Sequence, residues 1–278
     1  MSLVSRSFLF GLPAYTAYKA YAQARFELPM SIGFGHPTTL YKTDPRYAEV
    51  LKQLPGGHIK DEIKSFLHQS EIRKDLIVVE QYNSGFCTAG GTNIFTKSDA
   101  VVLVAPGLHK TDKDACHFVM KHEISHIKNN DLFTMNCVPC VCQVVASIFG
   151  MRFLSFRSAL MLVWIVGLVS EALFSMWREA KADDFAIKNS SDGELKGGRR
   201  VFITMKEANI EERNTTLWKQ LIISASGERR LDIFHPSFTS RIQKIEGALQ
   251  KRNVAIEIER QMIDDLKAIV KLTLRICE

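Results

Sequence analysis

The stretch His122-Glu123-Ile124-Ser125-His126 decides the fold of this 278-residue chain. Residues four apart lie on one face of an α-helix, about one turn apart, so both imidazoles can reach a single metal ion. Glu123 directly follows the first histidine, where it can act on a water molecule at that metal instead of binding the metal itself. We therefore expect a helix that carries half of a metal site together with a general base.

The residues around this pentad also favour a helix. Thr111 offers a capping hydroxyl, and Asp112 and Asp114 place acidic groups in the first turn. Apolar side chains for burial follow at Phe118, Val119, Ile124 and Ile127. The competing interpretation is a solvated helix with two unrelated histidines, because three fixed positions in five residues also arise by chance. A third protein ligand decides between the two interpretations, since a catalytic zinc ion takes three.

A third ligand is expected from further along the chain. A histidine at the metzincin spacing is missing, because Leu132 occupies that position. After Asp131 the next acidic residues are Glu171 and Glu179, which leaves two candidates. Glu171 interrupts an apolar run, so Glu179 is the better candidate.

Glu179 is followed one helical turn later by Asp183. A carboxylate at that position can accept the free ring N–H of a liganding histidine and fix the orientation of the ring. We therefore predict one zinc ion per chain on His122, His126 and Glu179, with Asp183 supporting a histidine. The alternative for the two carboxylates is a solvated acidic helix face.

The chain between the expected ligands is strongly apolar. Residues 132–151 carry no charge and are long enough as a helix to cross about 30 Å of hydrocarbon. After a short connection, residues 158–177 are apolar again except for Glu171. We predict a helical hairpin over 132–177 that crosses a membrane, with Glu171 facing the helix bundle or a wet cavity. The alternative is burial of the hairpin in the core of a soluble protein.

Three segments resemble the membrane-bound zinc metalloproteases of the HtpX heat-shock and CAAX prenyl type, which are gluzincin-type peptidases. They are the pentad with its extension to Asp131, the Arg-Glu-x-x-Ala-Asp segment that ends at Asp183, and His235-Pro236-Ser237 followed by Arg241-Ile242. The resemblance spans residues 83–245. It implies an α+β, mainly helical fold: a zincin-like core with the HExxH helix, a small sheet at the edge of the cleft and an inserted hydrophobic helical hairpin.

The resemblance also implies roles outside the metal ligands. His235 and Arg241 are expected to bind substrate or to stabilise the oxyanion, whereas the alternative for His235 is a surface turn before a helix. In such proteases a strand before the metal helix pairs with the substrate backbone. Residues 90–95 and 100–104 are the strand pair expected here, and an ordinary core hairpin is the alternative.

Four segments are expected along the chain. They are a membrane-associated or anchoring segment (1–43), the first part of the metalloprotease domain (44–131), the hairpin (132–177), and the second part with the third ligand and a C-terminal helix (178–278). Periodicity and composition further predict helices within 44–75, a strand over 76–80, a loop over 190–200 and one long amphipathic helix over 242–276.

Composition limits the partners of the protein. The net charge of +6 comes from scattered basic residues without an aromatic and basic array, so we expect no nucleic-acid partner and attribute the charge to anionic lipid or a solvated surface. The first 26 residues lack Asp and Glu, which fits an anchoring helix better than a secretory signal, with a mitochondrial transit peptide as the alternative.

Nothing in the spacing of the six cysteines demands a disulfide framework, so we expect a reducing compartment for the soluble part of the chain. Cys137 and Cys140 have redox or metal spacing, but they lie in the apolar run without a second pair, and small buried hydrophobes are the favoured interpretation.

The function expected is that of a zinc metalloendopeptidase acting on polypeptides. Misfolded or membrane proteins are the expected substrates by resemblance to HtpX-type proteases, because the long multi-span body of the prenyl proteases is missing. The alternatives are a non-catalytic zinc-stabilised membrane scaffold, a membrane-sensing adaptor without metal, and a narrowly specific processing protease. We expect an integral membrane protein with its metal site on the cytosolic side, or alternatively a mitochondrial membrane protein. The sequence indicates no oligomeric state.

Overall fold

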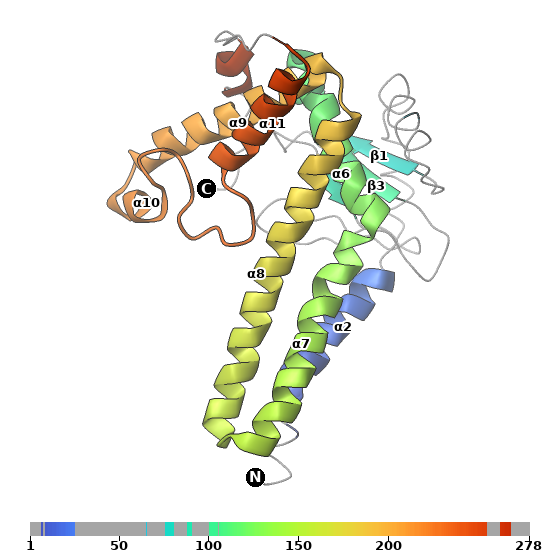
Figure 1. Cartoon of the computed structure of the whole chain (residues 1–278), viewed down its shortest axis with the longest axis vertical. Coiled ribbons are helices and arrows are strands. Elements are labelled where there is room, and N and C mark those ends of the chain that lie inside the picture. The colour runs from blue at the N-terminus through green and yellow to red at the C-terminus, as the bar shows by residue number, and fades with distance from the viewer. Residues whose placement is uncertain are drawn as a thin grey trace.

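The computed structural model describes residues 7, 9–25, 65, 76–80, 88–90, 100–104, 106–254 and 262–267. Within these residues the chain is mainly helical and has two parts (Figure 1). A long hairpin is formed by α7 (Asp131–Phe153) and α8 (Phe156–Asn189), and α2 (Gly11–Arg25) packs along it. The other elements form a head at one end of the hairpin, and α8 continues from the hairpin into the head.

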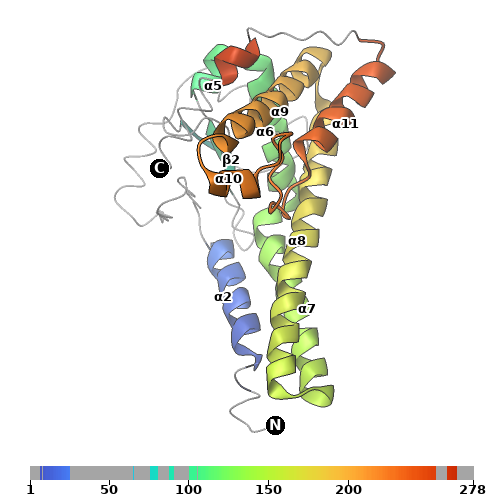
Figure 2. The same ribbon diagram turned by 90° about the vertical axis from the view of Figure 1, so that its left-hand side faces the viewer.

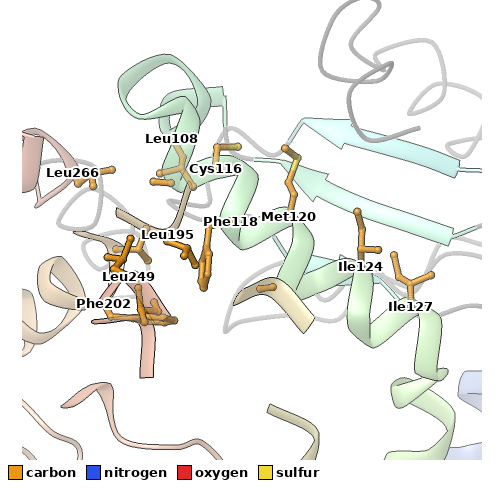
Figure 3. Packing of buried hydrophobic residues seen from close by; sticks show 14 residues of the cluster. Leu108, Cys116, Phe118, Met120, Ile124, Ile127, Leu195, Phe202, Leu249 and Leu266 are labelled. Atoms are coloured by element: carbon orange, nitrogen blue, oxygen red, sulfur yellow. The ribbon is translucent and has the colours of Figure 1, made fainter. Parts of the chain in front are cut away.

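The head is built around α6, the helix that carries the pentad. Its helices are α5 (Pro106–Thr111), α6 (Lys113–Asn129), α9 (Asp192–Arg213), α10 (Leu217–Ile222) and α11 (Phe238–Lys251). Phe118, Met120 and Ile124 of α6 are fully buried, together with Leu195 of α9 and Leu249 of α11 (Figure 3). The apolar side chains predicted from the sequence therefore anchor α6 in the core, and Phe118 packs one helical turn before His122 on the same side of the helix.

Two glycines allow α6 and α9 to approach each other closely. A Cβ atom on Gly197 would collide with the backbone of Ala115, and one on Gly198 would lie 2.5 Å from the ring of Phe118. These contacts place α9 directly against the first half of the metal helix.

The predicted loop over 190–200 is wrong, because these residues form the start of α9. The Ser191 hydroxyl accepts a hydrogen bond from Glu194 N, and the Glu194 carboxylate accepts one from Ser191 N, which is a complete capping box. The glycines that suggested a loop serve helix packing instead.

Three short strands lie beside α6. The order is β1 (Leu76–Glu80), β3 (Ala100–Val104) and β2 (Thr88–Gly90), with β1 parallel and β2 antiparallel to β3. Strands β1 and β3 coincide with the predicted strands over 76–80 and 100–104. The other predicted strand, 90–95, overlaps β2 only at Gly90, and its remainder lies outside the described residues, as does almost all of the helical segment predicted within 44–75.

Two packed helices, α7 and α8, lie where the helical hairpin was predicted. Its second helix is longer than expected, since α8 runs without a break to Asn189 and carries both Glu179 and Asp183. Of the described helices, α8 is the one long and apolar enough to cross a membrane, and α7 has a shorter apolar stretch, Cys137–Phe153. Exposed large apolar side chains on the two helices include Val141, Val145, Ile148, Phe149, Phe153, Met161, Trp164, Ile165, Val169 and Leu173.

Polar groups of the hairpin gather between α2, α7 and α8, which lie side by side (Figure 2). Glu171 is exposed and borders an open pocket of about 200 Å³ between these helices, together with Thr16 and Gln143. Thr16 donates a hydrogen bond to the Gln143 side chain (3.0 Å), and Ser147 donates one to the Leu9 carbonyl (3.1 Å). These contacts hold the N-terminal helix on α7.

Two further expectations concern the C-terminal helix and the cysteines. The single helix over 242–276 is wrong: α11 ends at Lys251, Asn253 adopts a left-handed conformation (φ 56°), and a separate helical segment covers 262–267. Among the described cysteines, Cys116 is buried and three on α7 are half-buried, all of them free. The Cys137–Cys140 pair therefore forms no disulfide.

Candidate metal centre

The start of the metal helix is fixed by a buried carboxylate. Asp112 is the N-cap of α6 and accepts a hydrogen bond from Ala115 N at 2.9 Å. The Asp112 carboxylate also accepts two hydrogen bonds from Arg200 of α9, from Nε at 2.7 Å and from Nη2 at 3.0 Å. The expected cap, Thr111, is instead the last residue of α5. A capping group that is also an ion-pair partner fixes the helix start against the neighbouring helix.

Three side chains from two helices converge on one point. His122 Nε2 lies 3.2 Å from His126 Nε2, Glu179 Oε2 lies 3.3 Å from His122 Nε2, and Glu179 Oε1 lies 3.4 Å from His126 Nε2. Zinc ligands lie at 2.0–2.1 Å from the ion, so two ligand atoms of a tetrahedral site are about 3.3 Å apart. All three observed separations match that edge length. The donor set therefore fits a zinc ion with three protein ligands and a fourth position open.

The ring of His122 is held from behind by Asp183. Its Nδ1 lies 3.0 Å from Asp183 Oδ1, which leaves Nε2 directed at the centre. Asp183 also accepts two hydrogen bonds from Arg241 of α11, from Nε at 2.8 Å and from Nη2 at 2.6 Å. The guanidinium carbon of Arg241 lies 4.0 Å from the centre of the Phe202 ring. The series of contacts from Phe202 through Arg241 and Asp183 to His122 thus links α9, α11 and α8 to the metal helix.

The ring of His126 has an equivalent partner in Asp131. Its Nδ1 lies 2.7 Å from Asp131 Oδ2. The contact depends on Asn130, whose left-handed conformation (φ 52°) ends α6 and starts α7 in a new direction. The sequence analysis included Asp131 in the extended motif but did not predict that it supports His126. The only available signal was an acidic residue five positions after a histidine.

Electrostatics within the centre favour a bound cation. Burial opposes the protonation of His122, but its hydrogen bonds with Asp183 and Glu179 outweigh that cost and raise its pKa to about 9. Burial also opposes the ionisation of Glu179, yet the hydrogen bond with His122 and the charges of both histidines bring the pKa of the glutamate well below its ordinary value. Positive charge is therefore stabilised between these groups, which is what a metal ion supplies.

The remaining predicted residues take different positions. Glu123 is half-buried on α6 and is rotated about 100° around the helix from His122. His235 is exposed in the loop before α11 and pairs with Asp232 at 2.9 Å, and its charge contributes to the lowered pKa of Glu179. Arg241, in contrast, lies behind the ligands, so its contacts favour a positioning role.

Two histidines on one helix, a glutamate on a second helix and a glutamate beside the first histidine are the residues that an HExxH centre with one metal ion requires. The chain matches the model of Peptidase family M48 over residues 58–249 and belongs to that family.

Individual relatives agree with this family. Protease HtpX of Xanthomonas euvesicatoria pv. vesicatoria is 27% identical over 181 residues, which is 55% of this chain and 60% of the relative. Protease HtpX of Stenotrophomonas maltophilia is 25% identical over 179 residues, with the same shares. Protease HtpX of Mannheimia succiniciproducens is 25% identical over 190 residues, which is 59% of this chain and 64% of the relative. The matches thus span about 60% of the length of these curated relatives.

Proposed function

We propose that this chain is a membrane-associated, zinc-dependent metalloendopeptidase. The observation that carries the proposal is the triangle of ligand atoms on His122, His126 and Glu179, whose three edges fit a tetrahedral zinc ion. Membership of Peptidase family M48 supports the same conclusion. A non-catalytic zinc scaffold is the second candidate, but it gives no reason for a glutamate directly beside the first ligand.

The proposed chemistry divides the work among the residues of the chain. Zinc, when bound, would polarise the scissile carbonyl and lower the pKa of the attacking water. Glu123 takes a proton from that water and passes it to the leaving amine, so the carboxylate is regenerated in each turnover. Asp183 and Asp131 accept hydrogen bonds from Nδ1–H of the two histidines, which directs the Nε2 lone pairs at the centre. His235, whose charge acts on Glu179, is the proposed donor to the oxyanion.

The proposed substrate is an extended polypeptide segment of a misfolded or membrane protein. Strand β2 is at the edge of the sheet and packs against α6, which supports recognition by strand addition. Main-chain hydrogen bonds would supply affinity with little dependence on sequence, as a quality-control protease requires. A narrowly specific processing protease would instead need side-chain pockets along this edge.

The hairpin supports the membrane part of the proposal. The large exposed apolar side chains of α7 and α8 would be costly in water, and lipid removes that cost. We propose that residues 132–177 cross the bilayer with segment 1–43 as an additional anchor. Segments 44–131 and 178–278 then form the protease domain on one side, the cytosolic side, with the corresponding face of a mitochondrial membrane as the alternative.

The decisive test compares Glu123→Gln with wild type on a zinc-loaded, detergent-solubilised preparation. Degradation of an unfolded model protein is expected to fall at least about 100-fold in the variant, because the general base is lost while the ligands remain. Asp184→Asn is the matched control: it removes one carboxylate from an exposed position on α8. Equal rates for wild type and Glu123→Gln, with equal zinc content, would rule out Glu123 as the base.

A further inference from the structure

A cluster of exposed apolar residues lies on α10 and the loop that follows it. Five large side chains within 17 residues are between 44% and 81% exposed. They are Leu217, Trp218, Leu221, Leu231 and Ile233. We name residues 217–233 the α10 surface. None of the three metal ligands lies on this surface, and a polar link from it to the proposed site is the contact of Asp232 with His235. An exposed apolar cluster of this kind marks an interaction site.

The α10 surface is held firmly in place. The Glu228 carboxylate accepts hydrogen bonds from Phe238 N at 2.9 Å and Thr239 N at 2.8 Å, at the start of α11. Asn209 of α9 donates to the Gly227 carbonyl at 2.9 Å, and Gly227 has a left-handed backbone (φ 82°). These hydrogen bonds fasten the turn at residues 227–228, between α10 and Leu231, to α9 and α11.

The position of the α10 surface suggests what covers it. In Figures 1 and 2, α10 lies at the far end of α9, apart from α8, at the edge of the head that is nearer the hairpin. Helix α8 also exposes apolar side chains along the hairpin, and Met176 and Trp177 are the last of them before the metal ligand Glu179. Tryptophan at the end of an apolar helix is typical of the boundary between lipid and water. The two exposed apolar regions therefore lie at a similar depth along the long axis of the molecule.

The chemistry of the α10 surface agrees with a lipid partner. Trp218 is followed by Lys219, and Leu231 is preceded by Arg229 and Arg230. Lys219 and Arg229 both pair with Glu212 of α9, while the side chains of Arg229 and Arg230 are exposed. Apolar and aromatic side chains with interspersed basic residues are typical of elements that lie in the headgroup region of anionic bilayers. An unfolded polypeptide would also satisfy the apolar groups, but it gives no reason for their alignment with the exposed end of the α8 apolar face.

We infer that the α10 surface is a lipid-docking element, which inserts its apolar side chains into the boundary between headgroups and acyl chains of an anionic bilayer. The inference rests on the proposed membrane hairpin. Docking at this second point fixes the head against the bilayer and places the metal centre at its surface. A substrate segment leaving the membrane would then meet the centre without crossing water.

The three tryptophans of the chain allow a direct test in the full-length protein. Single-tryptophan proteins are made from the Trp164→Phe, Trp177→Phe and Trp218→Phe substitutions in pairs, and reconstituted into vesicles of phosphatidylcholine and phosphatidylglycerol with or without brominated acyl chains. The control is Gln250→Trp in a tryptophan-free background, because Gln250 is exposed on α11. Zinc content verifies that each protein is folded.

We expect shallow brominated lipid to quench Trp218 at least about twofold more than the control tryptophan, with reduced access for iodide. Quenching of Trp164 but not of Trp218 would overturn the inference and leave the hairpin proposal intact. Protection of Trp218 by unfolded casein and not by lipid would overturn it in favour of a substrate surface. Absence of quenching at both Trp164 and Trp218 would overturn the hairpin proposal and the inference together, whereas the Glu123→Gln comparison tests the chemistry separately.

Discussion

At the residue scale, the orientation of the two histidines depends on the carboxylates behind them. His122 is backed by Asp183 and His126 by Asp131, at 3.0 and 2.7 Å. Without these acceptors either imidazole could rotate or carry its proton on Nε2, which would remove a ligand lone pair from the centre. Asp183 is itself held by Arg241, so the position of one ring depends on a residue 119 positions away in sequence.

The Asp183→Asn substitution should therefore weaken zinc binding without removing a ligand. We expect the zinc dissociation constant to rise about 10–100-fold, as for other acceptors behind metal-bound histidines. Competition with a chromophoric chelator measures it. Asp184→Asn is the control, because this neighbouring carboxylate is exposed and pairs only at the surface with Lys244. Similar dissociation constants for the two variants would show that Asp183 does not position His122.

How much of the centre could be predicted from the sequence depends on the range of each contact. His122, Glu123 and His126 follow from helix periodicity, and Glu179 with Asp183 from the same periodicity on a second helix. The contact of Asp131 with His126 depends on the turn at Asn130. The position of Arg241 behind Asp183 depends on the packing of α11. These tertiary contacts have no periodic signature.

At the element scale, the contact between α6 and α9 positions the metal helix. Gly197 lies where a Cβ atom would meet the backbone of Ala115, which cannot move as a flexible side chain can. We expect Gly197→Ala to lower the free energy of unfolding by about 1–3 kcal/mol, as overpacking of a tight contact does. Urea denaturation followed by circular dichroism measures the change.

Gly247→Ala on α11 is the matched control for this substitution. A Cβ atom there meets nothing within 4 Å, so the variant should instead gain about 0.5–1 kcal/mol from the better helix propensity of alanine. If both variants gained stability, the approach of α6 and α9 would be less tight than the structure indicates.

The start of α9 supplies a second stabilising contact, centred on Glu194. Burial opposes its ionisation, but hydrogen bonds with His117, Lys121 and the Ser191 backbone lower its pKa to about 2. The ordinary value is 4.5, so the ionised carboxylate stabilises the folded state fully above pH 4.5. This contribution should disappear as the pH falls from 4.5 toward 2.

We therefore expect Glu194→Gln to reduce the free energy of unfolding at pH 7 by about 2 kcal/mol, because buried Lys121 loses a charged partner at 2.7 Å. The difference from wild type should shrink between pH 4.5 and pH 2. Denaturation curves over this pH range measure both effects. Asp192→Asn, which removes an exposed carboxylate paired with Arg252, should change the stability by less than about 1 kcal/mol. A difference from wild type that persists at pH 2 would contradict the role of the Glu194 charge.

The elements that sequence patterns failed to predict share a physical cause. Residues 190–200 contain glycines and mixed charges, which are typical of a loop, but the Ser191 and Glu194 capping box starts a helix and the glycines serve its packing. The amphipathic pattern of residues 242–276 continues past Asn253, where the chain turns, so the pattern predicted a longer helix than the structure has. Periodicity predicts the face that a helix buries better than the residue at which it ends.

At the scale of the whole molecule, one helix joins the two proposed environments. The apolar half of α8 belongs to the hairpin, and its polar half carries Glu179 and Asp183 into the head. The third metal ligand therefore lies only a few residues beyond Trp177, where the apolar stretch ends. The centre and the proposed bilayer surface are linked by a continuous helix, so their separation cannot vary freely.

The exposed apolar face of the hairpin leads to a prediction about membrane insertion. Val145 and Val169 are exposed on α7 and α8, so arginine at these positions costs little in water but about 2.5–3.5 kcal/mol each near the centre of a bilayer. The double substitution Val145→Arg and Val169→Arg should therefore release much of the protein from membranes on alkaline carbonate extraction, whereas wild type stays in the pellet. Gln250→Arg, on the exposed surface of α11, should behave as wild type. Full retention of the double variant would mean that these two valines do not face lipid, and the bilayer would then have to contact the protein elsewhere.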